Sequence, residues 1–178
     1  MLTVLMECGA DDHGVAATLA TLVPGAVEGI VREVVLVDRG MTAASRKVAD
    51  HAGCRVVASG ELRQAVEAAR GDWLLLLEPG ARLQPGWIEA VIEHADTVAG
   101  GTAKNPAARF SRSRADRPGF FGRLRQVRTA LSEGFLLPKP QAVGRAGSAA
   151  DVETLARGLA VVALSAEIRP APRPRARG

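Results

Sequence analysis

The sequence predicts an α/β fold, namely a doubly wound, mostly parallel sheet with helices on both faces. Short apolar runs alternate with helical patterns through the first hundred residues, which is the order of repeated strand–helix units. The run Trp73–Leu77 is wholly apolar, as is typical of a strand covered on both faces. Ligands of such sheets bind beyond the carboxyl ends of the strands. The stretches that follow the predicted strands lie at 7–10, 38–40, 59–60 and 78–81.

The first hundred residues predict four strands and four helices. Asp11 and Asp12 are suited to cap the first helix, which Pro24–Gly25 is predicted to end. Pro85 opens the last helix, because its fixed φ suits a first helical position. In chain order we expect a strand at 3–6, a helix through 15–22, a strand at 33–37, a helix at 42–51, a strand at 54–58, a helix at 61–70, a strand at 73–77 and a helix at 85–95.

After Gly100 the regular alternation stops. The stretch 101–118 is rich in Arg, Ser, Pro and Ala, which predicts a loop. Alternating Pro and Arg near the end of the chain predict a disordered tail. We therefore divide the chain at 1–100, 101–166 and 167–178. Within the second part we expect an amphipathic helix at 120–131, a strand at 135–138, a helix at 150–159 and a strand at 161–164.

The net charge of +4 conceals a basic segment at 104–128, which holds eight basic residues against Asp116 alone. Local basicity of this kind indicates an anionic partner surface. The segment is either an ordinary solvated surface or a contact with a phosphate-bearing substrate or with anionic lipid headgroups beside Phe120 and Phe121. Nucleic-acid binding is disfavoured, because the segment contains no recognised motif.

Composition limits the remaining classes. The chain has 178 residues, 47% of them hydrophobic, which is enough for one globular domain with a core. It has no apolar run long enough to span a bilayer and no basic region before its first apolar run. We therefore expect a cytoplasmic protein, with peripheral contact at the inner membrane surface as an alternative. Cys8 and Cys54 are interpreted as small buried residues.

Four stretches follow one another in a recognisable order. The most specific is 69–87, where an Ala-x-Gly-Asp lead-in, an apolar strand, Glu78-Pro79-Gly80 and a Pro-Gly-Trp helix start succeed one another. The others are Thr3–Met6 with its loop, Val35–Gly40, and 134–139 with 150–155. Together they resemble the family-2 glycosyltransferases. That resemblance implies a GT-A-like fold, a nucleotide-sugar-binding half at 1–100 and an acceptor-side half at 101–166.

The resemblance also implies roles for residues at the predicted nucleotide site. Asp38 matches an Asp that hydrogen-bonds the base or ribose, and a carboxylate accepts from such N–H or hydroxyl donors. Its alternative role is to cap the next helix. Arg39 replaces the family's second Asp and is able to face a phosphate instead. Glu7 and Asp11 are further candidates for nucleotide contact, against helix capping for Asp11, and Arg70 is a candidate against a solvated helix-end role.

Glu78 matches the first carboxylate of the family's metal-binding Asp-x-Asp, and Gly80 stands where the second would be. Hard cations such as Mg²⁺ or Mn²⁺ prefer carboxylate oxygens and neutralise a diphosphate. The resemblance thus implies a divalent cation that is held more weakly, by Glu78 together with diphosphate oxygens and waters. The alternative is that Glu78-Pro79-Gly80 is a turn after a strand, as its Pro-Gly composition indicates.

Asp151 matches the general base of inverting members, which deprotonates an acceptor hydroxyl. Ala150 replaces the preceding Glu, Glu153 is a possible substitute base, and the alternative for Asp151 is a helix N-cap. The first hypothesis is therefore sugar transfer from a nucleoside diphosphate sugar to an unknown acceptor. The second is a degenerate binding protein without turnover. The sequence lacks the glycine-rich motifs of dinucleotide enzymes and P-loops.

Overall fold

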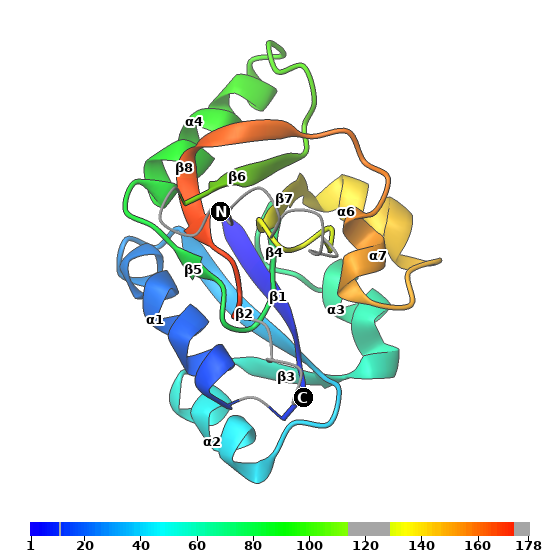
Figure 1. The fold of residues 1–178 in the computed structure, drawn as a ribbon. Coiled ribbons are helices and arrows are strands. Elements are labelled where there is room, and N and C mark those ends of the chain that lie inside the picture. The colour runs from blue at the N-terminus through cyan, green and yellow to red at the C-terminus, as the bar shows by residue number, and fades with distance from the viewer. Residues whose placement is uncertain (11, 114–128, 173–178) are drawn as a thin grey trace, which may run out of the picture.

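The computed structural model describes residues 1–10, 12–113 and 129–172. Their eight strands form one curled sheet in the order β3-β2-β1-β4-β7-β6-β8-β5 (Figure 1). The strands are β1 (Leu2–Cys8), β2 (Val31–Asp38), β3 (Arg55–Ala58), β4 (Trp73–Leu77), β5 (Arg82–Leu83), β6 (Ala108–Arg112), β7 (Phe135–Pro138) and β8 (Val162–Arg169).

Most strands of the sheet run in one direction. β1 pairs in parallel with β2 and β4, and β2 with β3. β7 is antiparallel to both β4 and β6, while β8 is parallel to β6. β6 and β8 therefore point the same way as β1–β4, and only β5 and β7 are reversed. The carboxyl ends of six strands consequently meet at one edge, which we call the carboxyl edge.

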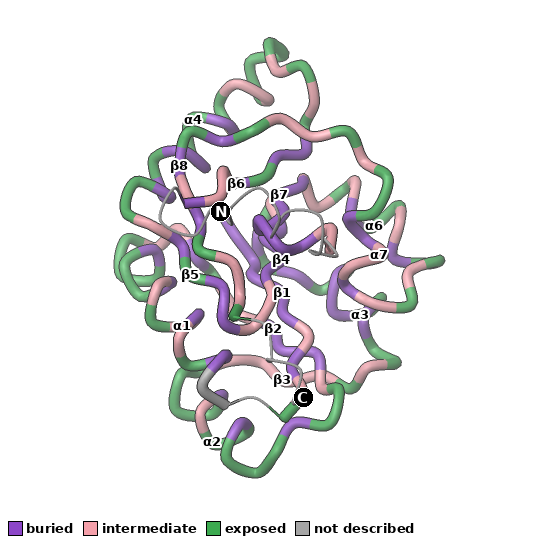
Figure 2. Tube along the Cα trace, viewed as in Figure 1, coloured by how far each residue is buried: buried purple, intermediate pink, exposed green. Residues whose placement is uncertain are grey.

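Helices cover both faces of the sheet (Figure 1). One face is packed by α1 (Asp12–Val27), α2 (Ala43–His51) and α4 (Trp87–Ala99), and the other by α3 (Leu62–Glu67), α6 (Lys139–Ala146) and α7 (Val152–Ala156). Alternate residues of β1 enter the two cores, with Val4 and Met6 on the α1 side and Leu5 on the α3 side. Figure 2 shows the buried residues concentrated along these central strands. The predicted doubly wound fold is confirmed.

The helix α1 is longer than we predicted. Pro24 lies inside it, and the helix continues to Val27, where the N–H of Glu28 donates to the carbonyl of Pro24 at 2.9 Å. A proline cannot donate to the carbonyl four residues earlier, here that of Ala20. Ala20 is exposed, so water can satisfy this carbonyl at little cost. The proline therefore did not end the helix.

The second half of the chain contains elements that the sequence pattern did not reveal. β6 lies within the predicted loop, because pairing with β7 and β8 stabilises a short strand of alternating buried and polar residues. α6 was also missed. β8 runs on to Arg169, so its last three residues fall in the segment predicted to be disordered, and Ile168 is fully buried there. Most of the helix predicted at 120–131 lies outside the described residues.

Candidate functional site

The carboxyl edge brings together three acidic residues from three neighbouring strands. Glu7 is the penultimate residue of β1, Asp38 ends β2, and Glu78 directly follows β4. The strand register places Cys8 beside Asp38 and Met6 beside Leu77, so the three strand ends are adjacent. Sheets of this kind bind their ligands at this edge. The structure thus gathers these predicted residues at the expected place.

Asp38 closes the turn between β2 and α2. Its Oδ1 accepts hydrogen bonds from the backbone N–H groups of Gly40 and Met41, both at 2.8 Å, and its Oδ2 accepts one from the Arg46 guanidinium. The N-cap of α2 is Thr42 rather than Asp38. The N–H donors of Met41 and Gly40 hold the pKa of Asp38 below its ordinary value. A carboxylate has about four acceptor positions, so one remains for a ligand.

Arg39 and Glu7 fasten the start of α7 to the carboxyl edge. Arg39 Nη2 donates to Glu7 Oε1 at 3.0 Å and to the carbonyl of Ala150 at 2.8 Å. Glu7 Oε1 also accepts from the N–H of Val152 at 3.2 Å. Both side chains remain partly exposed. Arg39 therefore joins the second half of the chain to the first.

Asp151 is the N-cap of α7 and directly follows Ala150, whose carbonyl accepts a hydrogen bond from Arg39. Its Oδ1 accepts from the backbone N–H of Thr154 at 2.7 Å and from the hydroxyl of the same residue. The Thr154 hydroxyl lowers the pKa of Asp151 below its ordinary value. The carboxylate is thus ionised at neutral pH and able to accept a proton, although a lower pKa weakens it as a base. The predicted capping role is observed, and it leaves the catalytic role open.

Glu78 and Gly80 form a tight turn after β4. The hydroxyl of Thr129 donates to Glu78, and the N–H of Ala81 donates to the carbonyl of Glu78 at 3.0 Å. Gly80 has a φ of 97°, and its N–H donates to the buried Oγ1 of Thr18 at 2.8 Å. A Cβ at Gly80 would lie 3.1 Å from the side chain of Pro172.

This donor set does not fit a two-carboxylate cation site. The second position has no side chain, and its φ of 97° disfavours any residue other than glycine. The first carboxylate accepts a hydrogen bond from a hydroxyl. Among the described residues, no three His, Cys, Asp or Glu side chains are grouped so as to hold a metal ion. The turn interpretation of this stretch therefore agrees with the geometry.

Arg70 and Asp11 do not join the other candidates. Arg70 precedes β4 at the amino-terminal edge of the sheet, and its N–H donates to Glu33 Oε1 at 2.6 Å. The neighbouring Gly71 N–H donates to Thr3 near the start of β1. Arg70 is thus separated from the carboxyl edge by the length of a strand, so we no longer assign it to the nucleotide. Asp11 lies outside the described residues.

Sequence reasoning missed a pair of arginines at the carboxyl edge. Arg82 of β5 and Arg169 of β8 are direct partners across an antiparallel pair, and both are exposed. With Gly80, Pro170 and Pro172 they line a cavity of about 200 Å³. Arg169 falls in the segment 167–178, which the sequence predicts to be disordered. Because Arg82 and Arg169 are far apart in the sequence, no local sequence pattern predicts that they pair.

Part of the basic segment 104–128 can be placed. Arg109 lies on β6 and forms an ion pair with Glu133, with 3.2 Å between Nη1 and Oε2. Residues 114–128 lie outside the described part of the chain, so contact with lipid or substrate there stays a prediction. None of the helices in the described ranges combines the length and the apolar character that crossing a bilayer requires.

The two cysteines are unsuited to nucleophilic chemistry. Burial raises the pKa of the Cys8 thiol to about 12 and that of Cys54 to about 11. Both thiols are therefore protonated at neutral pH, whereas the thiolate is the reactive form. Cys8 is buried, as interpreted, whereas Cys54 is only partly buried.

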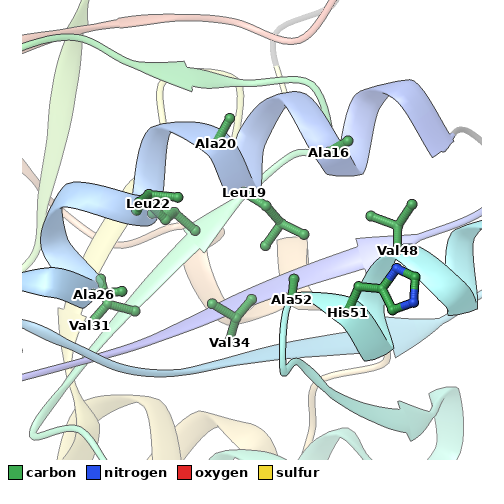
Figure 3. Close-up of a pocket in the computed structure, with 11 residues that line it drawn as sticks. Ala16, Leu19, Ala20, Leu22, Ala26, Val31, Val34, Val48, His51 and Ala52 are labelled. Atoms are coloured by element: carbon green, nitrogen blue, oxygen red, sulfur yellow. The ribbon is translucent and has the colours of Figure 1, made fainter.

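A larger cavity lies away from these residues. It measures about 460 Å³ and opens between α1 and α2 over β2 (Figure 3). Leu19 and Leu22 of α1, Val34 of β2 and Val48 of α2 point into it, and His51 is its one titratable lining residue among those described. The cavity lacks the polar groups that would orient a nucleotide.

Comparison with known proteins supports the fold. No family model and no curated protein sequence matches the chain. Glucosyl-3-phosphoglycerate synthase from Mycobacterium tuberculosis is similar in structure. Its complex with phosphoglyceric acid is 14% identical, with a TM-score of 0.58, over 98% of this chain and 73% of that one. Its complex with Mn²⁺, UDP-glucose and phosphoglyceric acid is 16% identical, with a TM-score of 0.59, over 98% and 72%.

A further structure, described as a mycobacterial protein, is 15% identical with a TM-score of 0.59, over 98% of this chain and 68% of that one. At this level of identity the likeness shows the fold alone. The chain therefore has a GT-A-like glycosyltransferase fold, as the resemblance implied. Membership of family 2 stays a prediction.

Proposed function

We propose that this protein transfers a sugar from a nucleoside diphosphate sugar to an acceptor. One observation supports the proposal most: a GT-A-like sheet gathers polar and charged groups from both halves of the chain at its carboxyl edge. These groups are Glu7, Asp38, Arg39, Glu78 and Asp151. The similar synthase has been solved with UDP and with UDP-glucose, which makes these the first ligands to test.

In this proposal Asp38 binds the nucleoside. Its remaining acceptor position suits a ring N–H or a ribose hydroxyl, and the bonds from Gly40 and Met41 fix its orientation beforehand. Glu7 and Arg39 hold the start of α7 against this edge, which keeps the acceptor-side residues close to the donor. They therefore act as positioning residues.

Asp151 is the proposed base. Its ionised carboxylate would accept the proton of the acceptor hydroxyl as that oxygen attacks the anomeric carbon and the nucleoside diphosphate leaves. The bonds from Thr154 fix the carboxylate, so the base does not have to be ordered during the reaction. Glu153, also on α7, accepts from the N–H of Ala130 at 3.4 Å and is the competing candidate.

Release of nucleoside diphosphate from UDP-glucose and GDP-glucose, with water as the acceptor of the glucosyl group, tests the proposal. We expect release by the wild type from one donor. D151N should lose the release but keep its urea midpoint, because asparagine is as good an N-cap as aspartate. D151A should lose the release and about 1 kcal/mol of stability. E153Q, which removes the neighbouring charge, should remain active.

Two outcomes would contradict this proposal. Activity in D151N with loss in E153Q would move the base to Glu153. The second outcome is a folded protein that binds the nucleoside diphosphate but releases none from UDP-glucose or from GDP-glucose. That outcome would indicate a binding protein without turnover.

A further inference from the structure

The turn after β4 offers a divalent cation one carboxylate, that of Glu78, where a two-carboxylate site has two. Gly80 stands at the second carboxylate position, and its backbone is fixed by a positive φ and by the bond to Thr18. A Cβ at this position would lie 3.1 Å from the side chain of Pro172. Glu78, the remaining carboxylate, accepts from Thr129. A diphosphate bound at this edge therefore needs positive charge from another source.

The same turn leads directly into a source of positive charge. Arg82 follows Gly80 by two residues, and the fold places it opposite Arg169. Directly opposed residues of an antiparallel pair project on the same face of the sheet. A phosphate group between two guanidinium groups in this arrangement can accept hydrogen bonds from both.

The chemistry and the size of the cavity suit a phosphate group. Each guanidinium presents a planar fork of donors that matches two phosphate oxygens. The cavity of about 200 Å³ opens to solvent between the two arginines and the chain at Pro170 and Pro172. Gly80 forms part of the wall of this cavity, so the cavity adjoins the turn where the diphosphate is expected.

We propose that Arg82 and Arg169 bind the donor diphosphate in place of a divalent cation, so that donor binding requires no metal. This inference rests on the proposed function. It assigns to two residues of this chain the charge neutralisation that a metal ion supplies in a two-carboxylate site. The leaving diphosphate would then be stabilised by guanidinium hydrogen bonds.

Calorimetric titration with inorganic pyrophosphate and with UDP, each in EDTA and in Mn²⁺, tests the inference. The wild type should bind both ligands in EDTA. R82Q and R169Q should each weaken binding about tenfold or more, since hydrogen bonds to charged groups are worth about 1.5–3 kcal/mol. R70Q removes the same charge at the opposite edge and should bind like the wild type. Equal urea midpoints would show that the variants are folded.

The outcomes separate this inference from the proposed function. Binding of UDP that needs Mn²⁺ and survives in the double variant R82Q/R169Q would overturn the inference and leave the proposed function standing. Equal binding of pyrophosphate by the wild type and the double variant would also overturn it. Failure to bind UDP under either condition would count against the proposed function itself.

Discussion

At the residue scale, two aspartates at the carboxyl edge accept hydrogen bonds from backbone N–H groups and are also candidate site residues. Asp38 holds the β2–α2 turn, and Asp151 caps α7. A cap, a turn and a ligand contact all require a short side chain that accepts hydrogen bonds. The sequence therefore identified both residues as candidates but was unable to separate the two roles. Their separation requires variants such as D151N, which keep the hydrogen bond and remove the charge.

The same hydrogen bonds predict a pH dependence of stability. They hold the pKa of Asp38 and Asp151 below their ordinary values. Such groups stabilise the fold above their unfolded pKa, about 3.9, and this contribution is lost as the pH falls through the folded pKa. We expect the urea concentration at the unfolding midpoint to decrease as the pH is lowered below about 4. This decrease should be smaller in D151N than in the wild type. Equal falls in the two proteins would contradict a stabilising role for the ionised Asp151.

The contacts of charged side chains were harder to predict from the sequence than any other property of single residues. Arg39 contacts Glu7 and Ala150, and Arg82 faces Arg169. Each arrangement depends on residues brought together by the sheet from distant parts of the chain. Residue type indicated a phosphate contact for Arg39, whereas its hydrogen bond to the carbonyl of Ala150 shows that the guanidinium joins two halves of the molecule.

At the element scale, the glycines of the stretch 69–87 have distinct structural causes. A Cβ at Gly71 would lie 2.4 Å from the backbone N of Thr3 and 2.8 Å from the carbonyl O of Met1, so β4 can begin beside β1 only with glycine there. Gly80 is required by its positive φ and by Pro172. The motif that suggested a family resemblance is thus also a requirement for packing these strands.

This close approach gives a prediction for stability. G71A should destabilise the protein by about 2–3 kcal/mol, because the contacted atoms are backbone atoms that cannot rotate away. G60A is the matched control, since Gly60 has open space around it and no positive φ, and we expect a change within about 0.5 kcal/mol. Urea unfolding measures both. Similar midpoints for G71A and G60A would contradict this account of the β1–β4 contact.

Elements with local patterns were predicted, and elements held by distant contacts were not. β4 has the predicted bounds, because its five apolar residues mark it unambiguously. α6 begins at Lys139-Pro140 and contains Gly144, which lowers its intrinsic helix propensity. It is stabilised instead by Ala142 and Ala146, which are buried in the core that α3 shares. Short helices depend on such packing, which a sequence pattern does not display.

At the scale of the whole molecule, the two halves of the chain build one sheet. β7 enters antiparallel beside β4, and β6 and β8 continue the sheet beyond it. The first four strands and their parallel arrangement followed from the alternating pattern. The order of the later strands depends on pairings between distant segments, so it was beyond prediction from periodicity. That order completes the carboxyl edge with Arg82, Arg169 and α7.

The location of donor binding tests the central claim most directly. Hydrogen–deuterium exchange would be followed in the protein with and without a saturating nucleoside diphosphate sugar. We expect slower exchange at the carboxyl edge, in the turns at 38–42 and 78–82, and no change around the apolar cavity between α1 and α2 (Figure 3). Slower exchange confined to that cavity, with the carboxyl edge unaffected, would contradict the account.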